Sequence, residues 1–134
     1  MQNSFTKGQQ VWQFRNWDDT TVSYRLVTIE SWGKKAGTVS LCENGRMSKS
    51  RVYTELLAKP RRQVDYGGEH YFAATPDFDP QAKALELAAV LISDHIATCR
   101  DRLQRPFYNN AEHWTAEIAK FEAATPAALS RPSL

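Results

Sequence analysis

The sequence has no long apolar run and few cysteines. No stretch approaches the roughly 20 apolar residues that a helix needs to cross a bilayer, and the first residues lack the charged and then apolar pattern of a secretory signal. Only two cysteines, Cys42 and Cys99, and no Asn-x-Ser/Thr sequence are present, so nothing points to an oxidising compartment. We therefore expect a cytoplasmic protein with no membrane partner, in which both thiols are reduced and buried.

Metal-ligand motifs are also missing, because no Cys-x-x-Cys or other paired-ligand motif occurs. His95 and Cys99 come nearest to a metal site, since they are four positions apart on a predicted helix and share one face. A zinc site would also need Cys42 together with His113 or His70 as the third and fourth ligands. The same two residues lie on the apolar stripe of the helix, where a buried thiol beside a hydrogen-bonded imidazole explains them. We expect no metal and no cofactor.

Catalytic signatures are absent as well. A Cys-His nucleophilic pair needs a base oriented by a third group, and no local signature supplies one. No phosphate-binding loop of the Gly-x-x-x-x-Gly-Lys type occurs among the 6 glycines. The neighbouring carboxylates at 18–19 and 77–79 fall at a predicted turn and a predicted helix start, which capping explains. A non-catalytic protein is therefore expected, and an enzyme with no recognisable motif stays the alternative.

The first half of the sequence is rich in alternating apolar and polar residues. They run through residues 10–15 and 21–29, and such alternation is typical of strands with one buried face. We predict strands over about 9–15, 20–32, 38–42 and 46–54, and a further strand or hairpin between 63 and 73. Met47, Val52 and Tyr53 are the apolar residues expected in the fourth strand.

Turn residues separate these strands. Gly33 and Gly37 bound one connection, and Asn44-Gly45 marks another, because these two residues tolerate the positive φ of a tight hairpin. Short strands joined by such turns predict that residues 1–75 form a small antiparallel SH3-like barrel or curled sheet.

After Asp79 the apolar period changes to that of a helix. Asp79 is a suitable N-cap, and Pro80 suits the first helical position. The helix is predicted to end near Arg105, before Pro106. Its buried stripe is predicted to comprise Leu85, Ala88, Ile92, Ile96, Cys99 and Leu103.

A second helix is predicted to begin at Asn109, with Glu112 as the partner in a capping box and with Trp114, Ile118 and Phe121 on its buried face. Residues 76–124 then form a two-helix half. Residues 125–134, rich in alanine and proline, are expected to be a flexible tail. The chain as a whole is expected to be one cooperative α+β domain, because the apolar face of the helices needs a cover.

The two halves differ in charge, although the formal net charge is only +2. Residues 1–65 hold 11 Lys and Arg against 6 Asp and Glu, whereas residues 66–134 hold 6 against 9. A basic binding surface is therefore expected on the sheet half, near the turns that project from the strands. The candidate binding residues are Trp32, Lys34, Lys35, Arg46, Arg51, Arg61, Arg62, Trp17 and Tyr53.

Two classes of partner fit this surface. We favour another protein, bound by an adaptor or inhibitor module, because Trp, Tyr and Arg are the residue types that anchor protein interfaces. Nucleic acid is the alternative, since basic and aromatic residues on small barrels also contact phosphates and stack on bases. A homodimer through the paired helices also fits the sequence. Lysines at turns are, in addition, ordinary devices for solubility and edge protection.

Overall fold

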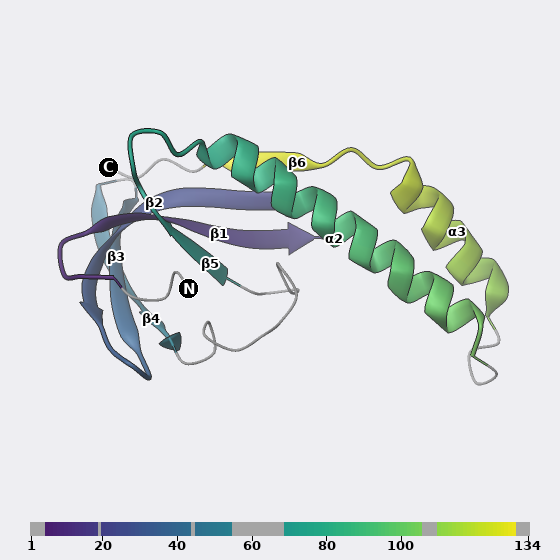
Figure 1. Ribbon diagram of the computed structural model, residues 1–134, viewed down its shortest axis with the longest axis horizontal. Helices are drawn as coiled ribbons and strands as arrows, with labels where there is room; N and C mark the ends of the chain where they lie inside the picture. Colours follow the sequence, from purple (N-terminus) through teal and green to yellow (C-terminus); the bar gives the residue numbers. More distant parts are fainter. Residues whose placement is uncertain (1–4, 19, 44, 55–68, 106–109, 131–134) are drawn as a thin grey trace.

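The computed structural model of the chain describes residues 5–18, 20–43, 45–54, 69–105 and 110–130. These residues form one sheet and two helices (Figure 1). In chain order the elements are β1 (Gln10–Asp18), β2 (Thr21–Trp32), β3 (Gly37–Glu43), β4 (Arg46–Val52), β5 (Glu69–Ala73), α2 (Pro80–Leu103), α3 (Ala111–Glu122) and β6 (Ala127–Ser130). Within this part of the chain no helix is long and apolar enough to span a membrane.

The sheet has the order β4-β3-β2-β1-β5, and every neighbouring pair in this order is antiparallel. It is strongly curled, so that β3 and β4 run across the direction of β1 (Figure 1). The predicted hairpin between β3 and β4 is confirmed: Glu43 pairs with Arg46, and Gly45 has a φ of 77°. The predicted α+β fold with a curled sheet is confirmed, whereas no strand pairing of the described residues joins β4 to β5 and closes a barrel.

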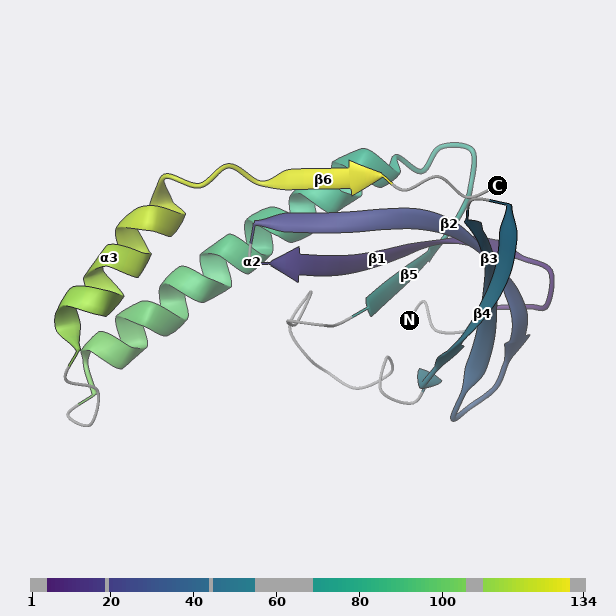
Figure 2. The ribbon, with the colours of Figure 1, turned by 180° about the vertical axis from the view of Figure 1, so that it is seen from behind.

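Strand β2 has partners on both edges. Its residues Thr21–Thr28 pair with β1 on one edge. On the other edge, Thr21–Tyr24 pair with β6 in parallel, and Thr28–Trp32 pair with β3. Strand β6 therefore continues the edge that β3 leaves open (Figure 2).

Strand β6 lies within residues 125–134, where the sequence analysis expected a flexible tail. The expectation of a tail without regular structure is wrong for Ala127–Ser130. The reason is that strand pairing satisfies backbone groups and needs no apolar pattern of its own. Ala128 also packs against the cluster under α2, which supplies a small apolar contact for this strand.

Both faces of the sheet carry a hydrophobic core. The inner face carries one core, made of Phe5, Val11, Val27, Ile29, Val39, Leu41, Val52 and Tyr71. The outer face carries a second core, in which Phe14, Val22 and Tyr24 pack against Ala84, Leu87, Ala88 and Leu91 of α2. Because successive side chains of a strand point to opposite faces, β1 and β2 contribute to both cores.

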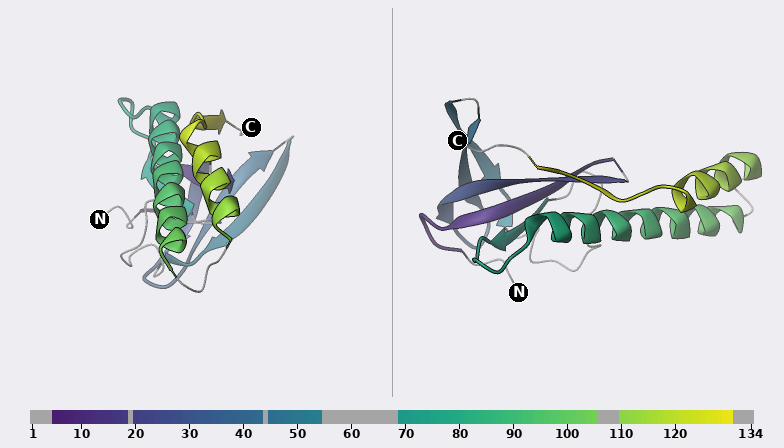
Figure 3. Two further views of the ribbon diagram at one scale, coloured as in Figure 1. Left: turned by 90° about the vertical axis from the view of Figure 1, so that its right-hand side faces the viewer. Right: turned by 90° about the horizontal axis from the view of Figure 1, so that it is seen from above.

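Helix α2 covers the outer face only with its first half, and its second half runs beyond the sheet beside α3 (Figure 3). Leu87 is buried, whereas Leu85 is 36% exposed. The prediction that Leu85 belongs to the buried stripe is therefore wrong. The buried residues of α2 lie on one side of the helix, and Leu85 stands just beyond the edge of that side. The side comprises Ala84, Leu87, Ala88, Leu91, Ile92 and Cys99.

The caps agree with the sequence at one helix and differ at the other. Asp79 caps α2 as predicted, because its Oδ1 accepts a hydrogen bond from the Ala82 amide at 3.1 Å. The N-cap of α3 is Asn110, whose Oδ1 accepts from the His113 amide at 3.3 Å. The predicted cap at Asn109 is therefore one residue early. Glu112 stands at the second helical position and not at the third, which a capping box requires, and Asn109 itself lies outside the described residues.

The buried face of α3 is narrower than predicted. Phe121 is buried as expected, whereas Trp114 and Ile118 are half-buried. Trp114 lies instead beneath the guanidinium of Arg102, whose Cζ is 4.8 Å from the ring centroid. A two-helix layer covers each helix on one side only, so its apolar residues keep part of their surface.

Leu87 and Leu85 form a matched pair for testing the interface between helix and sheet. We expect Leu87→Ala to lower the free energy of unfolding by about 2–5 kcal/mol, because it opens a cavity between α2 and the outer face of the sheet. Leu85→Ala removes the same atoms from a partly exposed position and is expected to cost clearly less. Urea unfolding followed by far-ultraviolet circular dichroism measures both. Equal losses for the two variants would contradict this placement of the helix.

Candidate interaction surface

The outer side of β4 is an exposed row of side chains. Met47, Lys49 and Arg51 point to the same face because they are two residues apart, and Tyr53 follows directly after the strand. Met47 is 69% exposed and Tyr53 58% exposed, so both are large apolar side chains in solvent. We call these four residues the β4 row. It lies on the outer face, beyond the part of the sheet that packs against α2.

Contacts within the described residues hold this row in place. The Nζ of Lys49 lies 3.3 Å from Oε1 of Glu30. The Arg51 guanidinium lies over the ring of Tyr53, with its Cζ 5.8 Å from the ring centroid. The pairing of Thr38 with Arg51 and of Ser40 with Lys49 ties the strand to β3. The row is therefore displayed on paired strands, which is a rigid support for binding residues.

A groove of about 350 Å³ runs beside the row. Its lining combines two cations with hydroxyl groups and small residues, namely Ser31, Ala36, Gly37, Thr38, Lys49, Ser50 and Arg51. Gly37 is required there, since a Cβ would lie 2.7 Å from the Ser31 carbonyl oxygen. Hydroxyl, ammonium and guanidinium groups are the side chains that bind carboxylate or phosphate oxygens.

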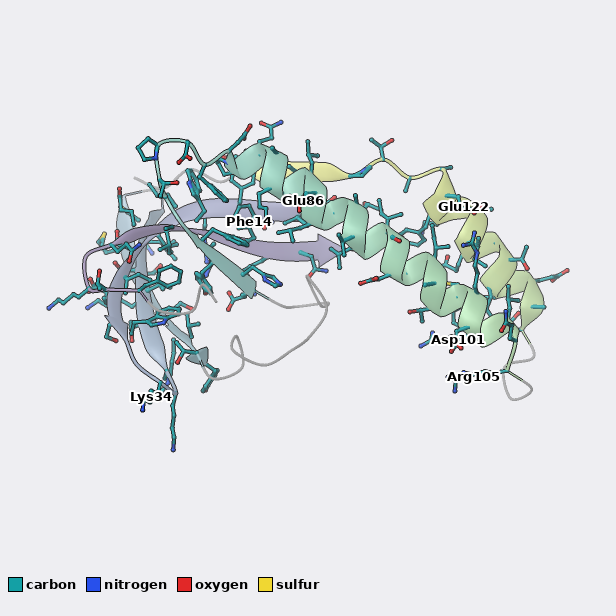
Figure 4. All side chains as sticks on the ribbon, in the orientation of Figure 1. Phe14, Lys34, Glu86, Asp101, Arg105 and Glu122 are labelled. Atoms are coloured by element: carbon teal, nitrogen blue, oxygen red, sulfur yellow. The ribbon has the colours of Figure 1, made fainter. Side chains whose placement is uncertain are left out.

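Part of the basic surface predicted from the sequence lies here. Lys34 and Lys35 are exposed in the turn between β2 and β3, and Figure 4 shows Lys34 extending away from the sheet. This turn is next to Arg51, because Thr38 pairs with Arg51 and Gly37 pairs with Val52. Arg46 is exposed at the opposite end of β4, about 16 Å away by strand geometry. The structure thus brings together Lys34, Lys35, Arg51 and Tyr53 but not Arg46.

Trp32 is not the exposed anchor that the sequence analysis predicted. Its ring packs edge-on against Phe5, with centroids 5.0 Å apart, and against Tyr71, at 5.9 Å, as part of the inner core. The cause is a bulge in β2, where the register with β3 shifts between Ile29 and Ser31. The extra residue turns Trp32 to the same face as Ile29. The side chain of Trp17 and residues Arg61 and Arg62 lie outside the described part of the structure.

Met47 and Lys49 are the members of the β4 row that the candidate list lacked. Met47 was expected among the apolar residues of the fourth strand, yet only Val52 of that strand is buried. The signal was present in the sequence, because Met47, Lys49 and Arg51 alternate with serines and share one parity, opposite to that of Val52.

The His95–Cys99 pair belongs to the interface between α2 and α3. Cys99 is fully buried, and its Sγ lies 3.6 Å from Nε2 of His95. Glu117 reaches the same nitrogen at 3.4 Å, and Phe121 packs on the imidazole with centroids 4.2 Å apart. A nucleophilic triad needs its nucleophile and its carboxylate on different ring nitrogens, so this arrangement is not one.

Both cysteines are free thiols, Cys99 buried and Cys42 half-buried, so the expectation of burial holds for Cys99 alone. Among the described residues, no three of His, Cys, Asp and Glu lie close enough together to hold a metal ion.

A polar network crosses the inner face at one end of the core. Gln13 is almost fully buried, and its Nε2 donates to the Tyr71 hydroxyl at 2.8 Å, while the Nε of Arg25 donates to Gln13 Oε1 at 2.6 Å. Glu69 accepts from Gln13 at 3.3 Å and pairs with Arg15 at 3.3 Å. Burial, together with the charge of Glu69, raises the pKa of the Tyr71 phenol far above its usual value. The phenol is therefore protonated at neutral pH and acts as a structural hydrogen-bonding group.

Tyr71→Phe tests this network. We expect a loss of about 1–3 kcal/mol in the free energy of unfolding at pH 8, because the buried Gln13 amide loses a partner. A phenol whose pKa is raised by folding stabilises the folded state below its unfolded pKa of about 10, and that contribution falls as the pH rises further. The wild type should therefore lose more stability between pH 8 and 11 than Tyr71→Phe does. Identical pH profiles in urea unfolding would contradict the assignment.

Comparison of the chain with protein-family models, with curated proteins and with solved structures gives no match in any of the three.

Proposed function

We propose that this chain is a non-catalytic protein-binding module, of the adaptor or inhibitor type, whose β4 row holds an acidic segment of another protein. The observation that carries the proposal is the presence of Met47 and Tyr53 in solvent, on the same face as Lys49 and Arg51. Tyr, Met and Arg are enriched in protein interfaces relative to the rest of the surface. A row of these types therefore supplies both apolar anchors and charge.

The dimensions and charges of the row favour an extended segment. From Met47 to Tyr53 the row is about 20 Å long at 3.3 Å per residue, which matches about six residues of extended chain. Carboxylates on that segment would face Arg51 and Lys49. Lys49 already pairs with Glu30, so Arg51 is the stronger candidate for a bidentate contact with a carboxylate.

Nucleic acid is the second candidate, and the groove beside the row supports it. The hydroxyls of Ser31, Thr38 and Ser50 and the cations of Lys49 and Arg51 line this groove, and such groups contact phosphates. Tyr53 would then stack on a base. The exposed Met47 favours a protein partner, because a thioether at the far end of the row makes no contact with phosphates. The salt dependence of binding distinguishes the two, since binding to the phosphate backbone falls steeply with salt.

The test is a selection of extended peptides from a random displayed library against the wild-type chain, followed by fluorescence anisotropy with variants. We expect acidic peptides to be selected. Arg51→Glu and Met47→Ala should each weaken peptide binding about tenfold or more, equivalent to about 1.4 kcal/mol. Arg46→Glu is the matched control, because it reverses the same charge on the same strand outside the row, and it should leave the affinity within about twofold.

Equal effects of Arg51→Glu and Arg46→Glu would show general charge attraction and contradict a defined row. Selection of peptides without acidic residues would contradict the proposed partner. Tighter binding to single- or double-stranded oligonucleotides than to any selected peptide, with a steep loss on adding salt, would establish the nucleic-acid alternative instead.

A further inference from the structure

Helix α2 has an exposed side that faces away from the sheet. Ser93 follows the buried Leu91 by two residues, which places it about 200° further around the helix. Ala89 and Ala97 lie one turn before and one turn after Ser93, and Glu86 and Arg100 lie two turns before and after it. All five residues are exposed. We call them the α2 stripe, and it spans about 21 Å along the helix axis.

A groove of about 570 Å³ with a mixed polar and apolar lining adjoins this stripe. It is lined by Ala89, Ile92, Ser93, Ile96, Ala97, Arg100, Phe121, Glu122, Ala124 and Pro126. One wall is α2, and the other is formed by the end of α3 and the segment that leads to β6. The second half of α2 and the whole of α3 project from the sheet as a two-helix layer (Figures 1 and 3).

The charges of the stripe are complementary to those of the same stripe turned end for end. Glu86 lies seven residues before Ser93, and Arg100 lies seven residues after it. If a second copy of the helix lies antiparallel with the two Ser93 residues facing each other, Glu86 of each copy meets Arg100 of the other. Ala89 of each copy then meets Ala97 of the other. An interface with two-fold symmetry requires such self-complementarity.

We infer that the chain forms a two-fold symmetric homodimer in which the α2 helices of two copies pack antiparallel along the α2 stripe. The alanines and Ser93 let the helix axes approach to the short end of the usual 8–10 Å range. At that distance each helix covers part of the groove of the other copy, including Ile92 and Ile96. Because the stripe faces away from the sheet, both β4 rows stay outside this interface.

The ion pairs set the direction of packing. Within one copy, Oε1 of Glu86 lies 3.4 Å from Nζ of Lys83. Nη2 of Arg100 lies 2.8 Å from Oε2 of Glu122. The side chains of Glu86 and Arg100 are 64% and 59% exposed, so both have room for a second partner. A guanidinium has five donors and can bind Glu122 and Glu86 of the other copy together. In a parallel arrangement Glu86 would face Glu86, which would cost affinity.

Sedimentation velocity of the full chain over a range of concentrations tests the inference. We expect the wild type to dimerise. By symmetry, position 86 of each copy faces position 100 of the other, so each single variant, Glu86→Arg or Arg100→Glu, creates two pairs of like charges across the interface. Each should weaken dimerisation about tenfold or more. The double variant restores opposite charges and should return the dissociation constant to within about threefold of the wild type. Glu112→Arg is the control, because it reverses an exposed charge on α3 away from the stripe, and it should dimerise normally.

Far-ultraviolet circular dichroism of each variant separates loss of the dimer from loss of the fold. Ser93→Arg is a second probe, since it sets two cations on the symmetry axis at an exposed position that no core contact needs, and it should yield a folded monomer. A monomeric wild type at all concentrations would overturn the inference. So would dimers that persist in Glu86→Arg and Ser93→Arg, or a double variant that stays monomeric while folded.

Discussion

The backbone of β2 forms hydrogen bonds with three other strands, β1, β3 and β6. The position of each surface described above depends on which of these strands pairs with each part of β2. Its first residues are held between β1 and β6, Thr28 lies between Gln10 at the start of β1 and Ser40 of β3, and its last residues pair with β3. Gly8 and Gln9 extend this pairing through hydrogen bonds with Ile29 at 2.7 and 2.8 Å. A strand of 12 residues that serves two different partners along one edge must bend, and the bulge near Glu30 marks the bend.

This bend divides the outer face into two regions. Over β1, β5 and the first half of β2, Phe14, Val22 and Tyr24 need a cover, and α2 supplies it. Over β3 and β4 the outer side chains are mostly polar or basic, Met47 is exposed, and no helix covers this region. The exposed β4 row and the covered helix face are therefore consequences of the same change in strand direction.

Several elements could be predicted because their causes are local. Asp79 and Pro80 define the start of α2, Gly45 defines the β3–β4 turn, and the alternation of 10–15 and 21–29 defines two strands. Of the predicted surface, Lys34, Lys35, Arg51 and Tyr53 lie together because the β2–β3 turn and the neighbouring end of β4 supply them. Charge on a turn and parity on a strand are properties of neighbours in sequence, so they needed no knowledge of the fold.

The remaining features depend on contacts between distant residues. Residues Ala127–Ser130 carry little strand signal and become a strand only because β2 has a free edge beside them. Trp32 is a residue type that often anchors interfaces at a surface. One extra residue in β2 shifts its register with β3 and directs the Trp32 side chain toward the inner core. Leu85 and Leu87 have the same side chain, and the sheet buries only the second. The sequence by itself determined strands β1 to β4, the start of α2 with its cap, the β3–β4 turn and the sign of the charge on each half, because backbone propensity and capping act over a few residues. Only the tertiary structure decided which edge is filled, which face each side chain takes and which apolar residues stay in solvent, because register and packing are set between segments far apart in the chain.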